Sequence, residues 1–93
     1  MGEKFLTLHP EGKQGVRIDL AKYEAIKRAI LTVLAQGDTT FKDLLDAVPP
    51  HLPADWSGSV SWYVVSVKLD LEARDVVRRV PGVKPQLLRL MRP

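Results

Sequence analysis

Apolar residues recur at the spacing of helical turns in three stretches of the chain, and this periodicity predicts three helices. We place these helices at residues 19–36, 40–48 and 57–74. Ser, Thr or Asp stands before the first turn of each stretch, and Gly or Pro follows two of them, as is typical of helix ends. The expected end residues are Asp19, Thr40 and either Asp55 or Ser57 at the starts, and Gly37 and Pro49 beyond the first two helices.

The segments that flank the helices have the composition of strands and turns. Residues 1–18 form an N-terminal arm with a short β-capable run at 4–8. Residues 76–91 hold two β-capable runs, separated by a segment that begins with Pro81 and Gly82. This dipeptide suits the two central positions of a type II turn. We therefore expect a C-terminal hairpin.

Three helices followed by one hairpin predict a fold that is mainly α with a small antiparallel β-hairpin. This element order is that of a winged helix-turn-helix, in which three helices precede a C-terminal wing. Residues 68–82 resemble the passage from recognition helix to wing in many bacterial winged-helix regulators. The segment departs from that pattern at Asp75, where a glycine usually takes the left-handed conformation that closes the helix. Aspartate tolerates this conformation better than most residues, so the expectation stands.

The whole chain also resembles a family of small bacterial proteins for which no activity is established. The recognisable parts are Gly-Val-Arg-Ile at residues 15–18, Ser-Val-Ser-Trp-Tyr at 59–63 and Leu-Glu-Ala-Arg at 71–74. This resemblance implies a fold and supplies no mechanism.

The amino-acid composition indicates what kind of protein this is. The chain has 93 residues, of which 45% are hydrophobic, and we expect one domain with a modest core. It contains no cysteine, which excludes disulfides and thiolate metal ligands and is compatible with a reducing compartment. No apolar run reaches the roughly 18 residues that indicate a membrane span. We therefore expect a cytoplasmic protein with no membrane partner.

The net charge of +3 is unevenly distributed along the chain. Residues 1–75 carry nine basic and eleven acidic residues, whereas residues 76–93 carry five basic and no acidic residues. One interpretation is a basic wing that contacts the phosphate backbone of DNA. The other is a solvated hairpin whose charges protect its edge from aggregation. The candidate nucleic-acid-binding residues are Arg78, Arg79, Lys84, Arg89 and Lys68, to which Arg92 and the unplaced Lys13, Arg17, Lys27 and Arg28 could add.

The third helix is poorly equipped to read bases, because Lys68 is the one Arg, Lys, Asn or Gln among residues 57–71. It has instead a second apolar face, formed by Trp62, Val65 and Leu69, opposite the stripe that should face the core. The N-terminal arm, a second subunit or another protein are three ways to cover this face. Two functions follow: a DNA-binding protein, or a non-catalytic module for protein interaction or homo-oligomerisation.

No pattern in the chain points to catalysis. His9 and His51 lie in separate predicted loops and have no Cys or paired carboxylates at metal-ligand spacing. The serines around the third helix lack the Gly-x-Ser-x-Gly elbow of a nucleophile, and no glycine-rich phosphate loop is present. We therefore expect a protein that is not an enzyme and has no metal, cofactor or small-molecule ligand.

Overall fold

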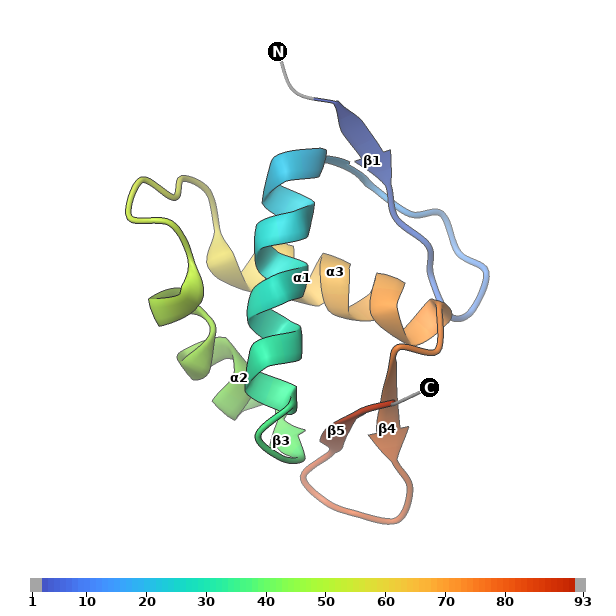
Figure 1. The fold of residues 1–93 in the computed structure, drawn as a ribbon. Coiled ribbons are helices and arrows are strands. Elements are labelled where there is room, and N and C mark those ends of the chain that lie inside the picture. The colour runs from blue at the N-terminus through green and yellow to red at the C-terminus, as the bar shows by residue number, and fades with distance from the viewer. Residues whose placement is uncertain (1–2, 92–93) are drawn as a thin grey trace.

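Two helices that cross one another form the centre of the molecule, with α1 in front of α3 in Figure 1. The structure is a computed structural model that describes residues 3–91. Along the chain its elements are β1 (Lys4–Leu6), β2 (Arg17–Asp19), α1 (Leu20–Leu34), β3 (Thr39–Thr40), α2 (Phe41–Ala47), the 3₁₀ turn η1 (Pro49–His51), α3 (Val60–Ala73), β4 (Val77–Val80) and β5 (Leu87–Leu90).

The start of α1 confirms the predicted cap. The carboxylate of Asp19 accepts a hydrogen bond of 3.0 Å from the backbone N–H of Ala21, which satisfies a donor that has no partner within the helix. The helix ends at Leu34, and Gly37 follows with a φ of +146°, a conformation that a side chain would disfavour. The buried face of α1 is made by Tyr23, Ile26, Ala29, Ile30, Val33 and Leu34.

α2 also begins at its predicted cap, where the hydroxyl of Thr40 accepts a hydrogen bond of 3.1 Å from the backbone N–H of Asp43. α2 ends at Ala47, before Pro49 and Pro50, because proline has no amide hydrogen to donate. The two prolines open the short turn η1 instead.

α3 begins later than predicted, and the expected cap at Asp55 or Ser57 is wrong. Gly58 has a φ of +107°, which is incompatible with a helix, so the helix starts after it. The Ser59 hydroxyl is the cap and accepts a hydrogen bond of 3.2 Å from the backbone N–H of Trp62. At the other end Asp75 takes the expected left-handed conformation, with a φ of +60°. The backbone N–H of Val76 then bonds to the carbonyl of Leu71, as in a Schellman motif.

The predicted fold class, mainly α with one small hairpin in a winged helix-turn-helix arrangement, is wrong. Residues 3–91 form a small α/β domain with two antiparallel sheets. β1 pairs with β2, and β5 lies between β3 and β4 in a three-stranded sheet. The pairs that set the register are Phe5 with Ile18, Thr40 with Leu87, and Arg79 with Leu88.

The missed strands are too short to show an alternating pattern. β2 has three residues and β3 has two, and each reads locally as the lead-in to the helix that follows it. Their strand character depends on partners elsewhere in the chain, such as Leu88 for Thr39. The expected C-terminal hairpin is present, but β3 covers one of its edges, so it is part of a sheet rather than a free wing.

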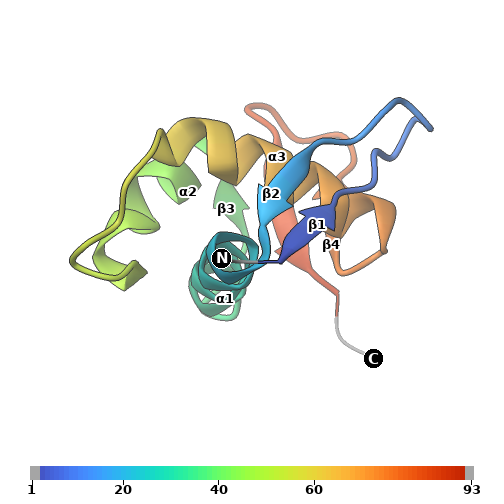
Figure 2. The same cartoon turned by 90° about the horizontal axis from the view of Figure 1, so that it is seen from above.

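The core lies between the helices and the three-stranded sheet. The sheet contributes Val77 and Leu88, which are 2% and 1% exposed. Residues from all three helices complete it, including Ile26, Ile30, Leu44, Val64, Val67 and Leu71. The β1–β2 pair lies apart from this sheet, beside the N-terminal end of α1 and the C-terminal half of α3 (Figure 2).

Candidate functional site

The structure uses three of the five candidate phosphate-binding cations in internal ion pairs. Arg79 Nε lies 2.6 Å from Glu72 Oε1, and Lys68 Nζ lies 2.8 Å from the other oxygen of the same carboxylate. Arg89 donates to Asp38 through both Nε and Nη2, with Nη2 at 2.8 Å. The Arg89 guanidinium holds the pKa of Asp38 below its usual value, chiefly through this hydrogen bond.

Lys68 is in addition largely buried. It is 8% exposed, and its ammonium lies 5.4 Å from the centre of the Phe41 ring on α2. Its position on α3 therefore faces the interior of the helical layer. The cation stabilises the packing of α3 on α2, and we infer no contact with phosphate.

Arg78 and Lys84 are the two hairpin cations that make no ion pair with residues 3–91. Both are exposed. Arg78 is the cross-strand partner of Arg89, whose charge Asp38 already balances. Arg92 lies outside the described residues. Among the described residues of the hairpin, two basic side chains therefore remain without an ion pair. Nucleic-acid binding stays a prediction.

The predicted interface residues lie together on the outer face of α3. Trp62 is 46% exposed and Val65 is 38% exposed, both large values for apolar side chains on a helix. Leu69 is half-buried, because the N-terminal arm approaches it and forms a shallow depression of about 50 Å³. The arm therefore covers one end of the face and leaves Trp62 and Val65 open. Leu8 and Ser66 line the depression with Leu69.

The arm is fixed by Asp70, a residue that sequence reasoning missed. This carboxylate is 0% exposed. It accepts a hydrogen bond of 2.8 Å from the backbone N–H of Leu8, a very short one from the hydroxyl of Tyr23, and bonds of 3.0 Å from Nε of Arg74. Three segments, the arm, α1 and α3, thereby meet at one buried charge.

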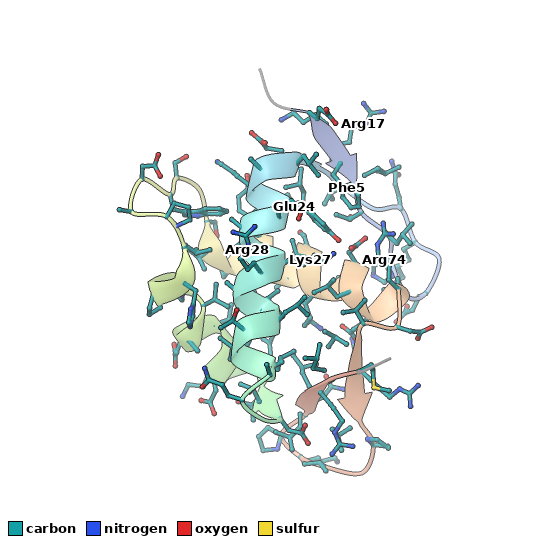
Figure 3. The ribbon with its side chains drawn as sticks, viewed as in Figure 1. Phe5, Arg17, Glu24, Lys27, Arg28 and Arg74 are labelled. Atoms are coloured by element: carbon teal, nitrogen blue, oxygen red, sulfur yellow. The ribbon has the colours of Figure 1, made fainter. Side chains whose placement is uncertain are left out.

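Aromatic packing supports the same junction. The centroid of the Phe5 ring in β1 lies 4.1 Å from that of the Tyr23 ring, and the Arg74 guanidinium carbon lies 5.2 Å from the Phe5 centroid. Figure 3 shows Phe5 and Arg74 on the arm side of α1. The available sequence signal was the position of Asp70 three residues after the buried Val67, at the edge of the apolar stripe. Helical spacing alone does not show whether a polar residue at the edge of an apolar stripe is buried or exposed to solvent.

Tyr23 should make the stability of the chain sensitive to alkaline pH. Burial, followed by the hydrogen bond to Asp70, raises the pKa of Tyr23 above its ordinary value of 10.0. The folded chain therefore keeps the phenol proton at a pH where the unfolded chain loses it. This contribution is complete below about pH 10 and falls above it, by up to about 1.4 kcal/mol per pH unit for one proton.

The measurement is the free energy of urea unfolding between about pH 9 and pH 12 for the wild type and Tyr23→Phe. Groups that titrate in both proteins cancel in the comparison. We expect the wild type to lose stability more steeply than Tyr23→Phe. Equal slopes would show that the buried phenol has no part in the pH dependence.

The two histidines lie in separate segments, the N-terminal arm and η1. Nδ1 of His9 accepts a hydrogen bond of 3.1 Å from the backbone N–H of Glu11 in the arm, and His51 lies in η1. In the part of the chain that the structure describes, no group of three or more His, Cys, Asp or Glu side chains is placed to hold a metal ion. Across residues 3–91, no helix has the length and apolar character needed to cross a membrane.

Comparison with known proteins gives a family and no activity. The model of a family described as "Family of unknown function (DUF6958)" matches residues 4–88, which include all three described helices and every described strand except the end of β5. No curated protein and no solved structure matches the chain. The match agrees with the resemblance to a family without an established activity, and it carries no winged-helix assignment. The chain belongs to the DUF6958 family of unknown function.

Proposed function

We propose that the chain is a non-catalytic interaction module that forms a homodimer through the outer face of α3. The observation that carries the proposal is an uncharged, partly apolar surface. Residues 56–67 contain no charged residue, although 27% of the chain is charged. Trp62 and Val65 are exposed at the middle of this stretch. Interface cores are depleted in charge and enriched in aromatic residues in the same way.

Charge favours a second copy of the chain as the occupant. Two chains that each carry a net charge of +3 repel one another over most of their surfaces. The outer face of α3 is a region where two copies can approach without placing like charges together. Nucleic acid, in contrast, would gain nothing from this face, because it offers no cation to phosphate.

The face is also self-complementary. Trp62 projects near one end, the depression beside Leu69 lies at the other, and Val65 lies between them. Trp62 and Leu69 are seven residues apart, or about 10 Å along a helix. An antiparallel pair of α3 helices related by a two-fold axis near Val65 would place Trp62 of each copy over the depression of the other.

A stable dimer needs more area than one helix face. A standard interface buries about 800 Å² on each partner, roughly an eighth of the 6024 Å² surface of this chain. The arm can supply the rest, since Leu6 and Leu8 are 56% and 46% exposed. They are two residues apart on an extended segment and project from the same side, and Leu8 lines the depression next to Leu69.

The test compares two valines that are equally exposed. Val65 on α3 and Val83 in the hairpin loop are both 38% exposed, so aspartate at either position adds the same charge at the same accessibility. We expect wild type and Val83→Asp to sediment as dimers and Val65→Asp as a folded monomer. The dimer dissociation constant should rise at least about tenfold for Val65→Asp, because one buried, unpaired charge disrupts an apolar interface.

Circular dichroism shows whether each variant keeps its helices. A wild-type protein that stays monomeric at several hundred micromolar would overturn the proposal. If Val65→Asp and Val83→Asp dissociated the dimer equally, the proposal would also be overturned. The effect would then come from the added charge itself and not from its position on α3.

A further inference from the structure

A groove runs along the side of α1 that faces away from α3. Its volume is about 480 Å³, and it is bounded by one face of α1 from Glu24 onward, by the C-cap residue Ala35 and by Leu90 of β5. The α1 residues that line it recur every three or four positions, so they form one continuous stripe. Figure 3 shows Glu24, Lys27 and Arg28 together on this front side of α1, with Arg17 apart from them on β2.

The two ends of the groove differ in chemistry. Leu31, Ala35 and Leu90 give one end an apolar lining, whereas Lys27 and Arg28 line the other. Neither of these cations makes an ion pair with residues 3–91. Lys27 instead places its ammonium 6.0 Å from the Tyr23 ring. With Glu24 included, the lining has a net charge of +1 and an apolar strip that no described element covers.

We propose that this groove binds an amphipathic helix of another protein, with carboxylates on either side of its apolar stripe. The lining extends over twelve residues, from Glu24 in α1 to the C-cap residue Ala35, which is about 16 Å or three helical turns and is the length over which a second helix packs alongside. Leucines of the partner would contact Leu31, Ala35 and Leu90, and its carboxylates would lie next to Lys27 and Arg28. Helix-in-groove recognition combines these two elements.

The apolar strip favours a peptide over a nucleic acid. A phosphate backbone would pair with Lys27 and Arg28 but would leave Leu31 and Leu90 in contact with water. The groove is also independent of the dimer surface, because α1 and α3 present their outer faces to opposite sides of the molecule (Figures 1 and 2). A partner in the groove would not compete with a second copy on α3, and either proposal can fail without the other.

The test uses a fluorescent probe peptide of about four helical turns, with leucines at i, i+3, i+4 and i+7 and glutamates beside them. Its anisotropy is measured against the wild-type chain, Arg28→Glu, Thr32→Glu and Arg78→Glu. Arg28 and Arg78 are both exposed arginines without an ion pair in the described chain, so their reversal changes net charge equally. Thr32→Glu adds an acid to the lining at an exposed position that makes no side-chain hydrogen bond within residues 3–91.

We expect micromolar binding to the wild type and to Arg78→Glu. Arg28→Glu and Thr32→Glu should each weaken binding about fivefold, as reversal or addition of one exposed charge can do. A probe in which lysines replace the glutamates should bind much more weakly. The proposal is overturned if the acidic probe does not bind, if Arg78→Glu weakens binding as much as Arg28→Glu, or if the lysine probe binds equally well.

Discussion

Asp70→Ala is expected to lower the melting temperature of the chain by about 15 °C. The substitution removes the common acceptor of Leu8, Tyr23 and Arg74, and it leaves the buried phenol hydroxyl and the partly buried N–H of Leu8 without this partner. Breaking a buried charged network in this way costs about 3 kcal/mol or more. Each kcal/mol corresponds to roughly 4–8 °C for a chain of this size. The measurement is thermal unfolding followed by circular dichroism or calorimetry.

Two variants make the Asp70 result specific. Asp46→Ala removes an exposed carboxylate from α2 and should change the melting temperature by a few degrees at most. Asp70→Asn keeps one acceptor oxygen and should fall between the alanine variant and the wild type. If Asp70→Ala melted as Asp46→Ala does, the buried network would not hold the arm to the two helices.

Combining Asp70→Ala with Tyr23→Phe would measure how far the two groups depend on each other. The Tyr23 hydroxyl donates to Asp70, so its removal should cost less once the carboxylate is gone. We expect the double variant to be more stable than the sum of the single effects predicts.

Gly15→Ala should release the N-terminal arm while the three described helices remain folded. A Cβ atom at Gly15 would lie 1.8 Å from the carbonyl oxygen of Thr7 and 2.7 Å from its carbonyl carbon. Both atoms belong to the backbone, so the two strands of the arm must separate to admit the methyl group. This breaks the bonds by which Thr7 N–H donates to Val16 O and Val16 N–H donates to the Thr7 hydroxyl. We expect a cost of about 2–3 kcal/mol, at the upper end for an added methyl group.

Hydrogen exchange measures this release directly, because the amides of Thr7 and Leu8 should lose protection while those inside α1 and α3 keep it. Gly12→Ala is the matched control. Gly12 has a φ of +74° and no atom within 4 Å of an added Cβ, so its variant has backbone strain without a clash. That strain costs about 1–2 kcal/mol and should leave Thr7 and Leu8 protected. Unchanged exchange at these two amides in Gly15→Ala would contradict the prediction.

The arm also links stability to the proposed dimer. Leu8 lies beside Leu69 in the shallow depression, and its backbone N–H bonds to Asp70. Gly15→Ala should therefore weaken the dimer as well as the arm, although it leaves Trp62 and Val65 in place. Sedimentation of this variant next to Val65→Asp would separate the contribution of the arm from that of α3.

Elements whose causes are local follow from the amino-acid sequence alone. Apolar spacing within single turns placed the three helices, and the caps at Asp19 and Thr40 act on amides two or three residues away. The left-handed Asp75 and the turn at Gly82, with a φ of +76°, follow from backbone preferences of short segments. Trp62 and Val65 were predicted on an outer face because helical spacing alone sets their direction.

Other features depend on residues that are far apart in the chain and meet only in the folded protein. β3 is a strand because Thr39 and Thr40 meet Leu88 and Leu87, and its two residues show no pattern of their own. Arg89 is neutralised by Asp38, 51 positions away, and Arg79 pairs with Glu72, so two of the four described cations of the basic run are paired within the fold. Asp70 holds the amide of Leu8 across 62 positions. Periodicity reports on the few residues of one turn, whereas burial of a charge and pairing of a strand depend on which distant segment the fold brings beside them.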